Sequence, residues 1–163
     1  GVALQFIIRF HLSITSFLSL QLRRPQKSLK MARLVGTWNL TDSENFDEYM
    51  QALGVNFALR KMGNLAKPSQ HISLEGEEFT IKTSSTFKNL EVKFKPGEEF
   101  EETTADGRKV KTTVALEGDS KMTMTQKGEP DSVLIRERTD DSTMVMTLEA
   151  KEVKCTRKYK LAE

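Results

Sequence analysis

Residues 35–65, VGTWNLTDSENFDEYMQALGVNFALRKMGNL, decide the fold because the spacing of apolar side chains changes within them. Residues 35–40 fit a short strand. From residue 45 to residue 53 the apolar side chains recur at helical spacing, with Asn45 as the cap and Glu48 placed as in a capping box. A second helix, capped by Asn56, is predicted to run to about residue 65. The stretch therefore predicts one strand followed by two short helices.

After residue 68 the chain consists of short segments in which apolar and polar side chains alternate. Residues 122–125 (MTMT) and 144–148 (MVMTL) are examples, and turn pairs such as Asp106-Gly107 separate the segments. A period of two residues is typical of half-buried antiparallel strands. With the first strand we count about ten, enough for the sheet to close into a barrel. We therefore predict an all-β fold in which the helical pair covers one open end as a lid and encloses a small molecule.

The charge distribution argues against a nucleic acid partner. The 163 residues carry 25 Lys and Arg against 23 Asp and Glu, a formal net charge of +2. Residues 1–30 contain five basic and no acidic side chains, so +5 of charge lies there and residues 31–163 carry −3. Binding by phosphate neutralisation requires a basic face on the folded part. No nucleic acid partner is therefore expected.

Cysteine and histidine are too few for most metal and redox chemistry. The single cysteine, Cys155, excludes an intrachain disulfide and fits a reducing compartment. The two histidines, His11 and His71, complete no zinc-binding pattern, so neither a metal nor a cofactor is expected. His71 lies in an alternating segment typical of a strand surface. We expect no enzymatic activity, and an enzyme with Cys155 as its nucleophile is the alternative.

Residues 1–30 are expected to lie outside the folded domain, which the sequence places at 31–163. Arg9 and His11 interrupt their apolar stretch, which leaves it too short for a membrane-spanning helix. They are interpreted either as sequence upstream of Met31 or as a targeting or anchoring segment.

Several predicted strands carry polar side chains at both parities, as in residues 99–104 (EFEETT) and 109–113 (KVKTT). If the sheet closes, some of these groups must point inward, where a dry core would penalise them and a wet, ligand-sized cavity would not. Solvated outer faces, with bulges that shift the parity, explain the pattern equally well.

The last predicted strand places Cys155, Arg157 and Tyr159 on one face. An arginine inside an apolar space requires an anion, and Arg157 and Tyr159 could both donate to one carboxylate. Arg136 could join them from another strand. Ordinary surface positions are the alternative, since most arginines are exposed.

A longer pattern resembles a known family. Residues 36–53, GTWNLTDSENFDEYMQAL, are similar to the signature of the intracellular lipid-binding proteins, specifically the fatty acid-binding proteins. Shorter similarities follow at residues 53–55 (LGV), 60–64 (RKMGN), 67–68 (KP), 85–89 (STFKN), 97–100 (GEEF), 103–106 (TTAD) and 155–159 (CTRKY). The resemblance covers residues 31–163 and none of 1–30. It implies a lipocalin-like, ten-stranded antiparallel up-and-down β-barrel, capped by a helix-turn-helix after the first strand.

The resemblance also implies a site and a function. In the branch with the heart, adipose, brain and epidermal forms, two arginines and a tyrosine hold the ligand carboxylate, and Arg136, Arg157 and Tyr159 match them. Phe87 resembles the portal gate. The other residues that match cavity or portal positions are Phe46, Tyr49, Met50, Val55, Ala105 and Asp106. The implied function is an intracellular carrier that binds long-chain fatty acids reversibly and transports them to membranes or enzymes.

The implied partners are a long-chain fatty acid and, transiently through the helical lid, a membrane surface, with the protein acting as a monomer in the cytoplasm. Arg60 and Lys61 match two of three basic residues that some relatives use to enter the nucleus, whereas the third position is Gln51. One alternative is a retinoic acid or other retinoid carrier, since that branch also uses two arginines and a tyrosine. Another is a membrane-tethered lipid donor that is anchored through residues 1–30.

Overall fold

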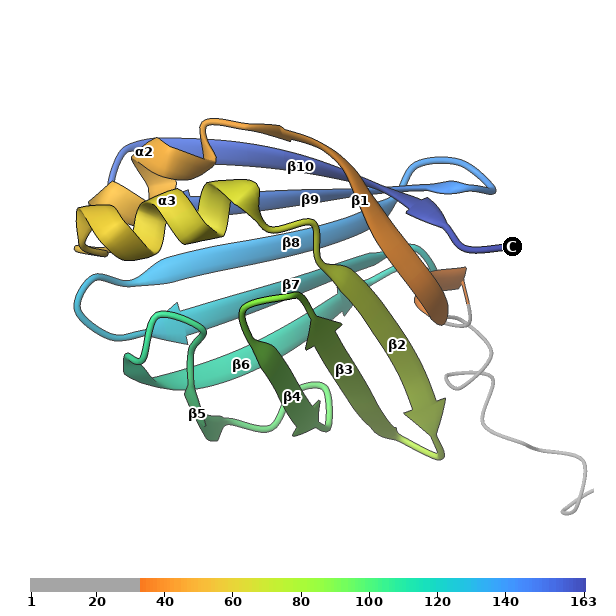
Figure 1. Ribbon diagram of the computed structural model, residues 1–163. Helices are drawn as coiled ribbons and strands as arrows, with labels where there is room; N and C mark the ends of the chain where they lie inside the picture. Colours follow the sequence, from red (N-terminus) through yellow and green to blue (C-terminus); the bar gives the residue numbers. More distant parts are fainter. Residues whose placement is uncertain (1–32) are drawn as a thin grey trace, which may run out of the picture.

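The computed structural model describes residues 33–163, which form ten strands and two helices (Figure 1). The strands are β1 (Gly36–Glu44), β2 (Ser69–Glu75), β3 (Glu78–Ser84), β4 (Asn89–Phe94), β5 (Phe100–Thr103), β6 (Lys109–Glu117), β7 (Lys121–Lys127), β8 (Ser132–Arg138), β9 (Thr143–Ala150) and β10 (Val153–Leu161). The helices α2 (Phe46–Ala52) and α3 (Phe57–Leu65) follow β1. The expectations for residues 1–30 lie outside the described residues.

All ten strands belong to one antiparallel sheet, in the order β4-β3-β2-β1-β10-β9-β8-β7-β6-β5. Neighbours in the sheet are neighbours in the sequence except for β1 and β10, whose pairing curls the sheet round into a nearly closed barrel. The two helices lie across one end of it (Figure 1). The predicted ten-stranded up-and-down barrel with a helical lid after the first strand is therefore confirmed.

Strand β1 is longer than the sequence predicts. It continues past Leu40 to Glu44, because its second half pairs with β10. The register between the two strands shifts between Leu40 and Asp42, which is where the polar residues begin. The Asp42 carboxylate lies 3.4 Å from the Lys158 ammonium on β10. Pairing with β10 therefore holds a turn-like sequence in an extended conformation.

The two helices begin differently. Asn56 caps α3 as predicted, since its side-chain oxygen accepts a hydrogen bond of 3.0 Å from the Leu59 N–H. The predicted side-chain cap at Asn45 is wrong. Asn45 has a left-handed backbone (φ 59) and caps no helix N–H; its amide instead donates to the Lys154 carbonyl at 3.3 Å. Among residues 33–163, neither helix is long and apolar enough to cross a membrane.

Trp38 fills the end of the barrel away from the helices. Its ring is fully buried, and its indole N–H donates to the Leu34 carbonyl at 2.9 Å. The Arg138 guanidinium lies 5.5 Å from the ring centroid and donates to the carbonyls of Arg33 and Asp140. These contacts join the chain before β1 to the turn between β8 and β9 and close this end of the barrel.

Candidate ligand-binding site

Inward-facing side chains of β6 to β10 align across the strands in three rows. The arginine row consists of Leu116, Met122, Arg136, Met146 and Arg157. The apolar row, nearer the helices, consists of Val114, Met124, Leu134, Leu148 and Cys155. The polar row, nearer still, consists of Thr112, Gln126 and Ser132. The barrel interior therefore has an apolar band between two groups of polar side chains.

Arg136 lies inside the barrel with 4% of its surface exposed. Its Nε donates to the Gln70 side-chain oxygen at 2.9 Å, and one terminal nitrogen lies 3.1 Å from the Met124 sulfur. Burial lowers the pKa of this guanidinium, and the nearby Tyr159 and Glu102 oppose the change. These neutral contacts leave the buried cation short of a negative partner, which a ligand anion would supply.

Arg157 lies across Met146 from Arg136 and is 7% exposed. Its guanidinium carbon is 4.0 Å from the centroid of the Phe46 ring on α2, a cation–π contact. Its Nε is buried and has no hydrogen-bond partner among residues 33–163. None of the ion pairs formed within residues 33–163 involves either arginine. A buried donor without an acceptor is costly, so Arg157 is prepared for an added acceptor.

Tyr159 supplies a third donor two residues beyond Arg157 on β10. It is 1% exposed, and burial raises the pKa of its phenol although the charges of Arg157 and Arg136 act to lower it. The phenol is therefore neutral at physiological pH and able to donate its O–H. The structure thus brings Arg136, Arg157 and Tyr159 together inside the barrel, and this set can hold one carboxylate.

A cavity of about 460 Å³ reaches Arg157 from the lid side. It is bordered by residues 40–43 of β1, by the start of α2 around Phe46, and by the segment after α3 that ends at Lys67. Its lining is more polar than apolar, with Leu40, Phe46 and Ala66 as the apolar residues.

The predicted cavity and portal residues divide into two groups. Phe46, Tyr49 and Met50 on α2 face the barrel, with Tyr49 and Met50 buried and Phe46 packed against the core. Val55 is half-buried in the turn between the helices. The second group, Phe87, Ala105 and Asp106, lies on the turns that surround the helical end.

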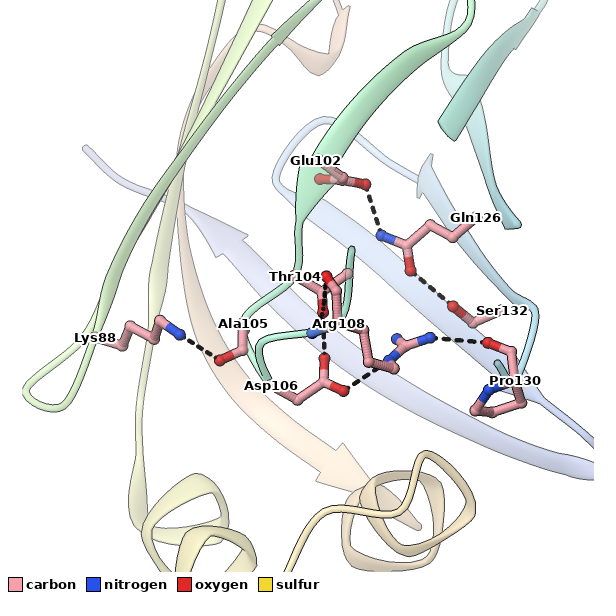
Figure 2. Close-up of polar contacts among 9 residues, drawn as sticks. All are labelled: Lys88, Glu102, Thr104, Ala105, Asp106, Arg108, Gln126, Pro130 and Ser132. Carbon is pink, nitrogen blue, oxygen red and sulfur yellow. Dashed lines mark hydrogen bonds and ion pairs between the residues drawn. The ribbon is translucent and has the colours of Figure 1, made fainter. Parts of the chain in front are cut away.

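Phe87 and Ala105 are exposed on two turns that meet. Phe87 lies between β3 and β4, and its neighbour Lys88 donates from its ammonium to the Ala105 carbonyl at 2.6 Å (Figure 2). The Asp106 carboxylate is engaged within its own turn, where it lies 2.7 Å from the Arg108 guanidinium and accepts a hydrogen bond of 2.6 Å from the Thr104 hydroxyl. Burial alone would raise the pKa of Asp106, but these two contacts outweigh it and lower the pKa.

Sequence reasoning did not identify the interior polar residues that lie nearer the helices than the arginine row. Glu102 on β5 accepts a hydrogen bond of 2.7 Å from the Thr112 hydroxyl. It accepts another of 2.7 Å from the Gln126 amide, whose oxygen accepts from Ser132 at 2.7 Å (Figure 2). The sequence carries polar side chains on both faces of residues 99–104, which indicated interior polar groups but did not show which face points inward. The structure settles this, since Glu102 points inward and Glu101 is exposed.

The arrangement does not support a cysteine nucleophile. Burial raises the pKa of the Cys155 thiol to about 11, with Arg157 acting to lower it, so the thiol is protonated at physiological pH. His71 is exposed on β2, where its ring nitrogen lies 2.9 Å from the Thr37 hydroxyl.

Comparison with known proteins identifies a family. The model of the lipocalin / cytosolic fatty-acid binding protein family matches residues 35–162. Sodium/calcium exchanger regulatory protein 1 of Doryteuthis pealeii is 51% identical over 129 residues, which are 79% of this chain and 96% of that protein. A Schistosoma mansoni fatty acid binding protein in complex with arachidonic acid is 41% identical, with a TM-score of 0.80 over 82% of this chain and 99% of that one. The fatty acid-binding protein in brain tissue of Drosophila melanogaster is 47% identical, with a TM-score of 0.73 over 77% and 98%.

Proposed function

The chain belongs to the lipocalin / cytosolic fatty-acid binding protein family, and we propose that it carries long-chain fatty acids, binding them reversibly in the barrel and delivering them to membranes or enzymes. The observation that carries this proposal is the buried Arg157 Nε without a partner, close to Arg136 and the Tyr159 phenol. One fatty acid carboxylate would satisfy all three groups, and its acyl chain would lie against the apolar row.

The acyl chain supplies most of the affinity in this proposal. Burying roughly 14 methylenes at about 0.8 kcal/mol each contributes about 11 kcal/mol. Ordering of the ligand subtracts several kcal/mol. A dissociation constant of roughly 1 μM is equivalent to about 8 kcal/mol, so sub-micromolar affinity requires the contacts of the carboxylate in addition to burial of the chain. The arginines and the tyrosine then determine how the ligand is oriented.

A retinoic acid carrier is the nearest alternative, because its ligand also ends in a carboxylate. Competition of oleate and of retinoic acid for one bound fluorescent fatty acid probe separates the two. We expect oleate to displace the probe at lower concentration, because a flexible chain adapts to the methionine-rich wall of Met122, Met124, Met144 and Met146. Displacement by retinoic acid at the lower concentration would favour the retinoid carrier, and displacement by neither would contradict a carboxylate site.

Transient contact of the lid with membranes is the second part of the proposal. Phe57 and Leu65 on α3 are 65% and 75% exposed, and Lys61 lies 5.1 Å from the Phe57 ring. Exposed apolar side chains next to basic ones suit an anionic lipid surface. The double substitution Lys61→Gln and Lys67→Gln is expected to slow transfer of a fluorescent fatty acid to acidic vesicles.

Lys95→Gln is the matched control for the lid variant, because Lys95 follows β4 at the end away from the lid. This change is expected to leave the transfer rate unaltered. Equal rates for the lid variant and the unmodified protein would indicate release through water instead of contact.

The remaining assignments follow from the family. The description of the family as cytosolic supports the cytoplasm as the location, and we propose that the protein acts there as a monomer. The name of the Doryteuthis pealeii relative refers to regulation of an exchanger, and we do not extend that partner to this chain, because the site accounts for a carboxylate ligand. The tethered lipid donor depends on residues 1–30; a native N-terminus at Met31 or Ala32 in mass spectrometry would eliminate it.

A further inference from the structure

A second polar group inside the barrel is unexplained by carboxylate binding. Thr112, Gln126 and Ser132 of the polar row are buried on β6, β7 and β8, and Glu102 reaches them from β5. The apolar row separates Thr112, Gln126 and Ser132 from the arginine row, and the Glu102 charge is close enough to act on Arg136. Thr112, Gln126 and Ser132 each have a hydrogen-bond partner, so the unused bonding capacity of the group lies at the half-buried Glu102 carboxylate and at the second Gln126 N–H.

The hydrogen bonds of the group leave one acceptor and one donor unused. Both donors to Glu102, from Thr112 and Gln126, go to the same carboxylate oxygen, Oε1. Within residues 33–163, no donor is bonded to the other oxygen, Oε2. The Gln126 amide nitrogen has two protons, of which Glu102 takes one. Glu102 is half-buried, and Oε2 is its remaining acceptor.

An acceptor beside a donor fits a hydroxyl group, which both donates and accepts. A water molecule fits the same pair, but a ligand hydroxyl that replaces it keeps the hydrogen bonds, whereas a plain methylene chain does not. A ketone only accepts and would bring its oxygen towards the Glu102 carboxylate. A second carboxylate would be repelled by it.

The position of the group relative to the arginine row defines where on a ligand the hydroxyl would lie. Gln126 follows Met122 by four residues on β7, and Ser132 precedes Arg136 by four on β8. At about 3.3 Å per residue the two rows are about 13 Å apart along the strands. A zigzag of C–C bonds about 1.5 Å long advances about 1.3 Å per bond, so an anchored chain passes the polar row at roughly carbons 8 to 12.

We propose that Glu102 and Gln126 form a second subsite that selects long-chain fatty acids with a hydroxyl group near the middle of the chain. The inference rests on the proposed function, because the carboxylate held by Arg136, Arg157 and Tyr159 fixes the position of the hydroxyl. The free Glu102 oxygen accepts the hydroxyl proton, and the second Gln126 N–H donates to the hydroxyl oxygen.

A series of 18-carbon ligands tests the subsite on the unmodified protein, with dissociation constants measured by calorimetry. We expect 10-hydroxystearate to bind about tenfold more tightly than stearate, since a hydrogen bond to a charged group contributes about this factor. Both 3-hydroxystearate and 10-oxostearate are expected to bind more weakly than 10-hydroxystearate, the first because its hydroxyl is misplaced and the second because it cannot donate.

The substitution Glu102→Gln is expected to shift the preference between 10-hydroxystearate and 10-oxostearate towards 10-oxostearate. The new amide oxygen still accepts from Thr112 and Gln126, but the free side now donates, so 10-oxostearate is expected to gain on 10-hydroxystearate by about tenfold. Glu101→Gln is the matched control, because Glu101 is adjacent on β5 and exposed on the outer face. It is expected to leave every ratio unchanged.

The ratios of the dissociation constants measured on the unmodified protein test the subsite even if a variant does not fold. Tight stearate binding, with 10-hydroxystearate no better than stearate or no better than 3-hydroxystearate, would overturn the subsite and leave the carrier function intact. Failure of all four ligands to bind would overturn the proposed function and the subsite with it. An unchanged oxo-to-hydroxy ratio in a folded Glu102→Gln protein would also overturn the subsite.

Discussion

Arg157→Gln is expected to weaken oleate binding at least tenfold while leaving the fold intact. Arg157 is 7% exposed, and within the described part of the chain, residues 33–163, its Nε has no partner, so removing it breaks no hydrogen bond there at that atom. It does remove a charged donor from the carboxylate, which then remains buried with less compensation. A factor of ten corresponds to about 1.4 kcal/mol of binding free energy, which is modest for a buried charged hydrogen bond.

Calorimetric titration with oleate measures this effect, and circular dichroism checks the fold. Lys158→Gln is the matched control, because it removes the same charge from the next residue of β10, where the side chain points outward towards Asp42. The control is expected to bind oleate as the unmodified protein does. Unchanged affinity in Arg157→Gln would remove this arginine from the site, and equal losses in both variants would indicate a general charge effect.

Trp38→Ala is expected to lower the free energy of unfolding by about 3–5 kcal/mol. The ring is fully buried at the closed end of the barrel, and its N–H is bonded to the Leu34 carbonyl at 2.9 Å. The truncation leaves a cavity and a carbonyl without its donor, and it removes the ring beside the Arg138 guanidinium. Domains of this kind are stable by only about 5–15 kcal/mol in total, so the loss would be a large part of the whole.

Urea unfolding followed by far-ultraviolet circular dichroism measures this loss, since Trp38 is the only tryptophan and its removal abolishes the fluorescence signal. Phe57→Ala is the control, because this aromatic ring is 65% exposed on α3. It is expected to change the unfolding free energy by less than about 1 kcal/mol. A loss below 1 kcal/mol for Trp38→Ala would contradict the role of the ring in closing the barrel.

Local pattern was sufficient to predict the fold and to place Arg157 and Tyr159 on one face of β10. Alternation by two defines a strand face, and the helical spacing of residues 45–53 defines the lid. Pattern could not decide which face pointed inward, because strands such as β5 carry polar groups on both faces. Only the hydrogen bonds to Thr112 and Gln126 show that Glu102 and not Glu101 reaches the polar row.

The partners of individual polar side chains could not be predicted from the sequence either. Asp106 was predicted at a cavity or portal position, and its carboxylate is engaged by Arg108, two residues further along the same turn. Asn45 was expected to cap α2, and contact with β10 instead places its amide on the Lys154 carbonyl. In each case several partners were compatible with the sequence, and the three-dimensional arrangement selected one.

The central claim is that a fatty acid carboxylate lies inside the barrel beside Arg136, Arg157 and Tyr159. Nuclear magnetic resonance of bound oleate, labelled with carbon-13 at its carboxyl carbon, tests it most directly. Two nearby positive charges lower the pKa of a carboxyl group. The resonance of bound oleate is therefore expected to keep its ionised position as the pH falls from about 7 to about 5. A resonance that titrates like that of a free fatty acid would place the carboxylate in solvent and contradict the account.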